Sequence, residues 1–165
     1  MKSLEEQMAA YSAYHQDARN KATHFAGVPV IILALFIALA WARIGPVSAG
    51  MVLAGVLVLY YLVLDVPLGL GMLLVFAALL WAGERIAALS ALQAWIWFAV
   101  LFIGGWCLQL IGHLYEGRRP ALVDNLFQIF VAPIFLCAEV FFALGYKPGL
   151  HSAIQQRAQR LRALA

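Results

Sequence analysis

The sequence has few charged residues. Asp, Glu, Lys and Arg make up 12% of its 165 residues, whereas soluble domains contain about 25%. Hydrophobic residues reach 65%, against about 45–50% in soluble domains, and the mean hydropathy is +0.89. The net charge of +3 is spread along the chain, without the basic, aromatic-studded groove typical of nucleic-acid binding. The composition therefore excludes a soluble domain and predicts one integral membrane domain over residues 1–165.

Cysteines and processing signals are scarce as well. The two cysteines, Cys107 and Cys137, lie inside apolar runs, so no disulfide scaffold or metal clamp is expected. The first 24 residues are polar and of mixed charge, unlike a signal peptide. Position 2 is Lys2 and the C-terminus carries no prenylation cysteine, so no lipidation motif is present.

The apolar residues form runs close to the length that a spanning helix needs, about 20 residues. The runs cover residues 25–42, 47–64, 68–82, 92–112 and 126–146. The fold class predicted from them is all-α, a polytopic transmembrane bundle of four to five spanning helices. A polar N-terminal helical segment, residues 1–24, precedes the bundle at 25–146. The basic tail, 147–165, predicts an amphipathic helix on the membrane surface.

Polar interruptions mark the expected turns. Asp65 is expected at a wet turn of a tight hairpin, and residues 83–91 are expected to form a soluble loop. Gly104 and Gly105 predict a soft break in the fourth run. Glu139 lies within the fifth run, where an ionised side chain is costly. We expect it to pair with a loop arginine or to bond a backbone group.

The chain has only four histidines, and three of them are candidates for one site. His24 precedes the first run and His113 follows the fourth; an even number of crossings between them predicts that both lie at the same membrane face. His15 and His24 are nine residues apart, so they face opposite sides of a straight helix. Both can bind one ion only if the segment bends, or if it splits into two helices around Asn20. Imidazoles suit iron, zinc, copper or nickel, and interface histidines that bond headgroups are the alternative.

Two motifs resemble a known membrane family. They comprise Tyr14, His15, Asn20, His24, Gly27 and Pro29, followed by Gln109, Gly112, His113, Glu116, Arg119, Pro120, Ala121, Leu122, Asp124 and Asn125. The family is typified by the yeast endoplasmic-reticulum 2-hydroxy fatty acid dioxygenase. The resemblance covers nearly the whole chain, in the same motif order and at similar spacing.

The resemblance implies an Fe(2+)-dependent enzyme that shortens a 2-hydroxy long-chain fatty acid by one carbon with O2, in fatty acid α-oxidation. His15, His24 and His113 match the family's histidines and are the predicted metal ligands, whereas His151 matches none. Asn20, Glu116 and Asp124 match polar motif positions and are predicted to support the catalytic site. Glu116 is three residues from His113 and shares its helical face, so it is predicted either to bind the metal or to orient an imidazole. Arg119, or Arg118, is predicted to hold the substrate carboxylate.

Other functions stay open from the sequence. A non-catalytic protein that binds membrane lipids or assists assembly is one, and a small transporter using Asp65 and Glu139 is another. The basic residues near the histidines predict that their face is cytoplasmic. The expected location is a bacterial inner membrane, or the endoplasmic reticulum in a eukaryote. The oligomeric state is left open, a homo-oligomer included.

Overall fold

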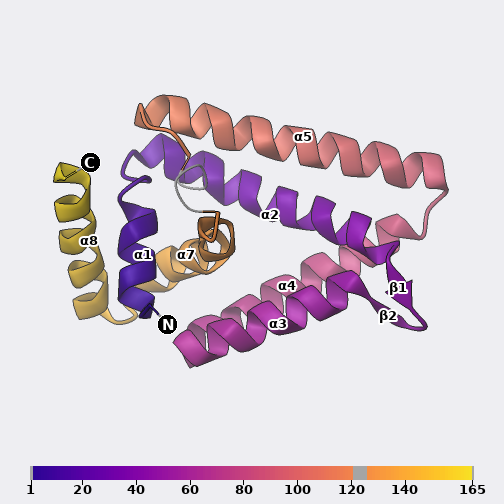
Figure 1. The fold of residues 1–165 in the computed structure, drawn as a ribbon, viewed down its shortest axis with the longest axis horizontal. Coiled ribbons are helices and arrows are strands. Elements are labelled where there is room, and N and C mark those ends of the chain that lie inside the picture. Colours follow the sequence, from indigo (N-terminus) through magenta and orange to yellow (C-terminus); the bar gives the residue numbers. More distant parts are fainter. Residues whose placement is uncertain (1, 121–125, 165) are drawn as a thin grey trace.

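A computed structural model describes residues 2–120 and 126–164, and helices dominate this part of the chain (Figure 1). Its elements are α1 Leu4–Ser12, α2 Ala18–Ala40, β1 Arg43–Ile44, β2 Val47–Ser48, α3 Ala49–Leu64, α4 Val66–Ala87, α5 Ala91–Glu116, α7 Gln128–Ala143 and α8 Pro148–Ala163. The two strands form only a short antiparallel hairpin between α2 and α3. The all-α prediction is therefore confirmed.

Three of the described helices, α2, α4 and α5, are long and apolar enough to cross a membrane. The apolar helices α3 and α7 have 16 residues each, which is below the usual spanning length of about 17–25 residues. The span count of four to five is therefore not confirmed. Many large apolar side chains of α4 and α5 are exposed, among them Leu74, Trp81, Trp95 and Ile103, as expected for helices that face lipid.

Helices α2 and α5 run side by side in opposite directions, so the start of α2 lies next to the end of α5 (Figure 1). Small residues allow this close approach. A Cβ atom on Gly105 would lie 2.6 Å from Cγ1 of Ile31, and one on Gly112 would collide with Oγ1 of Thr23. The pairing brings His24 and His113 to one end of the bundle, as predicted, while their position at one membrane face stays a prediction.

The predicted hairpin at Asp65 is present, but its turn is not wet. Asp65 caps both helices, because it ends α3 and its Oδ1 accepts the backbone N–H of Leu68 at 3.2 Å. Its side chain is only 2% exposed and forms an ion pair with Lys147, whose Nζ lies 2.7 Å from Oδ2. A buried carboxylate at the α3–α4 junction needs such a partner. The expectation of a solvated turn is therefore wrong.

Three further expectations need correction. Helix α5 continues through Gly104 and Gly105 without a break. Most of the expected loop at 83–91 is helical, because α4 extends to Ala87. Glu139 pairs with Lys21 of α2 at 3.0 Å, not with an arginine.

The basic tail forms the predicted helix, α8, and it packs beside α1 (Figure 1). Arg157 of α8 lies 3.0 Å from Glu6 and 3.4 Å from Glu5 of α1. The apolar side of α8 buries Ile154 and Ala158. The N- and C-terminal helices therefore form one layer at the end of the molecule where α2 begins.

Candidate metal centre

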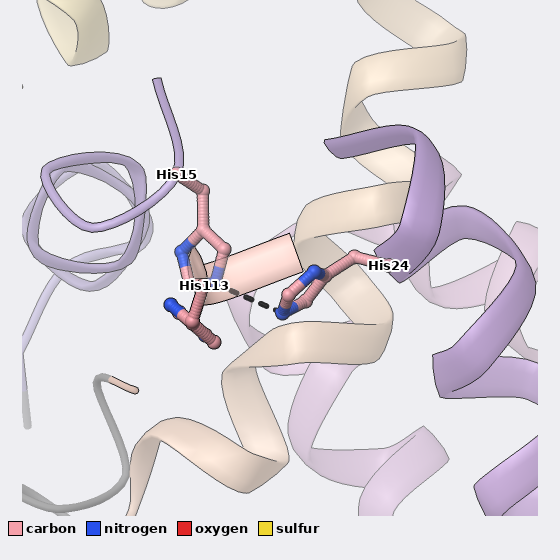
Figure 2. Close-up of side chains that lie close together, drawn as sticks. All are labelled: His15, His24 and His113. Carbon is pink, nitrogen blue, oxygen red and sulfur yellow. Dashed lines mark hydrogen bonds between the residues drawn. The ribbon is translucent and has the colours of Figure 1, made fainter. Parts of the chain in front are cut away.

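His15, His24 and His113 converge where α1, α2 and α5 meet (Figure 2). One ring nitrogen from each histidine lies within 4.8 Å of the others. The three side chains are 2%, 3% and 7% exposed, so the cluster is buried. The predicted convergence is confirmed, while a role as metal ligands stays a prediction.

The N-terminal segment splits in two, which resolves the unfavourable spacing of His15 and His24. The break lies at residues 13–17, before the expected position at Asn20. Asp17 begins the second helix, because its Oδ1 accepts the backbone N–H of Arg19 at 2.8 Å. Aspartate is a favoured helix N-cap, so this break was readable from the sequence. Because His15 lies in the turn, it can face back toward His24.

Backbone carbonyls fix the orientation of two of the rings. Nδ1 of His15 lies 2.7 Å from the carbonyl oxygen of Tyr11, and Nδ1 of His24 lies 2.9 Å from that of Asn20. A carbonyl oxygen only accepts hydrogen bonds, so each Nδ1 carries the proton and donates. Each neutral ring then presents the lone pair of Nε2, and the two Nε2 atoms lie 3.1 Å apart (Figure 2).

This donor set fits a transition-metal ion. Two lone pairs that face each other with no proton between them are repulsive, and a cation removes that repulsion. Burial lowers the pKa of His15 well below its ordinary value, and the neighbouring His24 adds to the effect, so protonation of His15 is disfavoured. Imidazole nitrogens lie about 2.0–2.1 Å from a bound zinc ion, and two that bind at right angles are roughly 3 Å apart. Metal-binding histidines commonly donate their other N–H to a backbone carbonyl, as His15 and His24 do.

Glu116 holds the turn that carries His15. Its side chain is fully buried, and Oε2 accepts hydrogen bonds from the backbone N–H groups of Gln16 at 3.0 Å and Asp17 at 2.8 Å. The amide of Asn20 donates to the same oxygen at 3.1 Å. Arg162 of α8 donates to Oε1. Both oxygens thus have partners in the surrounding framework, and Glu116 is not part of the histidine cluster.

The other predicted residues lie at varied places. Asn20 is fully buried, and its Nδ2 also donates to the carbonyl oxygen of Tyr14 at 3.2 Å. Arg119 is exposed and does not line the apolar cavity beside the histidines. Asp124 lies outside the described residues. His151 stacks on Phe142 at 4.7 Å between ring centroids and stays outside the cluster.

An apolar cavity of about 320 Å³ has the three histidines in its wall. Six α2 residues at helical spacing line it, namely His24, Val28, Ile31, Ile32, Leu35 and Phe36. His24 and Phe36 are twelve residues apart, which corresponds to about 18 Å at 1.5 Å per residue. The cavity is therefore elongated along α2, with the histidine side chains near one end and apolar side chains along the rest.

Sequence reasoning missed two residues of this cavity as site residues, Gln109 and Gln128. Both are buried, and both line the cavity. The spacing of Gln109, four residues before His113, could have identified it, because such pairs share a helical face. No sequence pattern identifies Gln128 as a cavity residue. It begins an apolar helix, and which side of that helix faces the cavity depends on long-range packing.

Two comparisons with known proteins found a match. A family model described as "2-hydroxy-palmitic acid dioxygenase Mpo1-like" matches residues 1–144. A protein of Saccharomyces cerevisiae, "2-hydroxy-palmitic acid dioxygenase MPO1", is 33% identical over 157 residues, which cover 92% of this chain and 87% of the yeast protein. No solved structure matches. The yeast relative gives no support to the expected bacterial inner membrane.

Proposed function

Because this chain belongs to the Mpo1-like family, we propose that it is an iron(II)-dependent dioxygenase that converts a 2-hydroxy long-chain fatty acid to the fatty acid one carbon shorter. The observation that supports this most directly is the histidine cluster in the wall of an elongated apolar cavity. One 2-hydroxy acid and one O2 balance as the shorter acid, carbon dioxide and water, so no external reductant is needed.

The metal supplies the oxygen chemistry, and the protein supplies orientation and burial. When bound, iron(II) would provide redox chemistry with O2 and open positions for a chelating hydroxyl and carboxylate. The carbonyl oxygens of Tyr11 and Asn20 hold the protons on Nδ1 and so keep both Nε2 atoms free. Glu116 fixes the turn between α1 and α2, which keeps His15 beside His24.

The cavity suits a single acyl chain. Its length along α2, about 18 Å, is close to the thickness of one leaflet, half of the roughly 30 Å hydrocarbon core of a bilayer. The far wall consists of apolar side chains such as Leu35, Phe36 and Phe76. Burial of an alkyl chain there stabilises the complex by about 0.8 kcal/mol per CH₂ group. A 2-hydroxy fatty acid therefore satisfies both the polar and the apolar end of the site.

We infer that Asn20 and Glu116 support the ligands. Arg119 and Asp124 are proposed as catalytic residues because they match the family's motif. Helices α2, α4 and α5 are proposed to span the membrane. Helices α3 and α7, at about 24 Å for 16 residues, are proposed to enter the apolar layer with them and to make four or five crossings in total.

The test is anaerobic reconstitution of the purified protein with iron(II), followed by addition of 2-hydroxypalmitate and O2. We expect one equivalent of tightly bound iron, O2 consumption and a C15 fatty acid identified by mass spectrometry. His15→Ala, His24→Ala and His113→Ala should each lose iron and activity. His151→Ala is the matched control, because His151 lies outside the cluster, and it should retain both.

A second candidate function is lipid binding without catalysis, because the apolar cavity could hold a lipid without any reaction. That function predicts that 2-hydroxypalmitate binds while no O2 is consumed and no C15 acid forms. Full activity of a His113→Ala variant would contradict the metal site. The transporter alternative is weakened, because Asp65 and Glu139 are held in ion pairs with Lys147 and Lys21 and neither lines the cavity.

A further inference from the structure

Unpartnered polar atoms concentrate in the cavity. Five buried side-chain nitrogen or oxygen atoms have no hydrogen-bond partner within the described residues. Three of the five belong to cavity-lining residues, and they are Nδ1 of His113, Nε2 of Gln109 and Oε1 of Gln128. A buried polar atom without a partner costs about 1–3 kcal/mol. Their gathering in one cavity indicates a ligand with polar groups.

Gln109 is the unpartnered residue next to the metal centre. It is 7% exposed and lies on α5 one turn before His113, on the same helical face. Its Nε2 occupies the place where a side chain at Gly27 would begin, so the two would collide. Gly27 in turn lies three residues after His24 on α2. The Gln109 amide is therefore one helical turn from metal ligands on both helices.

We propose that Gln109 binds the carboxylate of the fatty acid through an N–H···O hydrogen bond from Nε2. This inference rests on the proposed function, because it assigns that function's substrate head group to a residue. A carboxylate only accepts hydrogen bonds, so an amide N–H is a complementary partner and an amide oxygen is not. Hydrogen bonds to an ionised acceptor are roughly twice as strong as neutral ones.

The placement explains why an amide stands here in place of a cation. The predicted carboxylate-binding residues, Arg118 and Arg119, do not line the cavity. Arg118 donates to the carbonyl oxygen of Arg162 at 3.2 Å, and Arg119 is exposed. A guanidinium in this apolar cavity would be costly to bury before substrate binds. A neutral amide costs less and still presents a donor.

The experiment compares binding of palmitate and hexadecanol, which share a C16 chain and differ in the head group. Full-length protein is held anaerobically with iron(II), and dissociation constants are measured by calorimetry. Wild-type protein should prefer palmitate. Gln109→Met should reduce that preference by about 10-fold to 100-fold, the value of a hydrogen bond to a charged group. Gln109→Glu, of almost the same shape, should reduce it further at a pH at which the new carboxyl group is ionised, because two carboxylates repel.

Gln128→Met is the comparison variant for the shape of the cavity. It also removes a buried amide from the same cavity, but the unpartnered atom of Gln128 is Oε1, which cannot bond a carboxylate and can accept the hydroxyl of hexadecanol. Its preference for palmitate should therefore not fall below that of wild type. An unchanged preference in Gln109→Met and Gln109→Glu would overturn the inference. An equal loss in both methionine variants would also overturn it, because the effect would then belong to the shape of the cavity.

Binding and turnover separate the two proposals. If iron-loaded wild type forms no C15 acid but its palmitate preference depends on Gln109, the dioxygenase proposal fails and the carboxylate site stands. If turnover proceeds and Gln109→Met leaves KM for 2-hydroxypalmitate unchanged, the carboxylate site fails and the dioxygenase stands. Iron stoichiometry is measured for each variant, since Gln109 is not a ligand and its replacement should leave iron bound.

Discussion

At the scale of single residues, the approach of α2 to α5 depends on glycines at the histidine cluster. Gly112 precedes His113, and the space where its Cβ would lie is bordered by Asn20, Thr23 and Nδ1 of His24, the last at 3.2 Å. Any side chain at this position therefore pushes against the residues that hold His24. Gly104, two turns earlier on the same helix, has open space around it.

This contrast gives a matched pair of substitutions. Gly112→Ala should cost about 1–3 kcal/mol through overpacking and should lower iron affinity at least 10-fold, because His24 must shift. Gly104→Ala should keep iron affinity and stabilise α5 by roughly 0.5–1 kcal/mol, because glycine is a poor helix former. Iron titration and thermal unfolding measure the two effects. Equal behaviour of the two variants would contradict a tight α2–α5 contact at the site.

The residue scale also shows what the sequence can and cannot reveal about the site. His24 and His113 could be brought together by counting crossings, and Gln109 by its spacing from His113. The role of Glu116 depends on contacts with Gln16 and Asp17, about 100 residues away in the chain. Its spacing from His113 predicted that Glu116 binds the metal or orients an imidazole. In the structure, its carboxylate oxygens accept hydrogen bonds from the α1–α2 turn and from Arg162.

At the scale of elements, α8 connects the C-terminus to the candidate centre. It lies outside the residues that the family model matches, 1–144. Arg162 donates to the buried carboxylate of Glu116, and Arg157 pairs with Glu5 and Glu6 of α1. The helix thus contacts both the segment before His15 and the carboxylate that fixes the turn after it.

Arg162→Ala should loosen this end of the molecule. It removes one partner of a buried carboxylate, and because Arg162 is about one-third exposed, we expect a cost near the lower end of the 1–3 kcal/mol typical of such groups. Iron affinity should fall by a smaller factor than in the histidine variants. Arg160→Ala is the control, because Arg160 is exposed on the same helix. Thermal unfolding in detergent compares the two variants, and equal stability would argue against the role of α8.

Element boundaries were predictable where local signals exist. Apolar runs gave the helices, and Asp65 gave the hairpin. The start of α1 has a capping box, Ser3 with Glu6, and Asp17 caps α2; both could have been read. The docking of α8 on α1 could not, because Arg157 is one of several cations in the tail and its partners lie about 150 residues away. Ion pairs between distant parts of the chain produce no periodic pattern in the sequence.

At the scale of the whole molecule, the bundle combines a polar end with an apolar interior. The histidine cluster lies where α1, α2 and α5 meet, and the cavity extends from it along α2, with further lining residues from α1, α3, α4, α5 and α7. Exposed apolar side chains are frequent on α4 and α5. Under the proposed function, the acyl chain of the acid would lie in the apolar part of the cavity and its head group at the polar end.

The far end of the cavity should set the preferred chain length. Phe36 is the cavity residue of α2 most distant from His24 along the helix, and its ring packs edge-on against Phe76 at 5.8 Å between centroids. Both rings are 2% exposed, and under the proposed function we expect them to close the cavity beyond the acyl chain. Phe76→Leu opens room there without adding a polar group, and the preferred substrate should become longer by one or more CH₂ groups, each worth about 0.8 kcal/mol when buried.

Phe98→Leu on α5 makes the same replacement outside the cavity and should leave the preferred chain length unchanged. Competition among 2-hydroxy acids of C12 to C20, with products resolved by mass spectrometry, measures the shift. A shift toward shorter acids, or an equal shift in both variants, would place the acyl chain elsewhere.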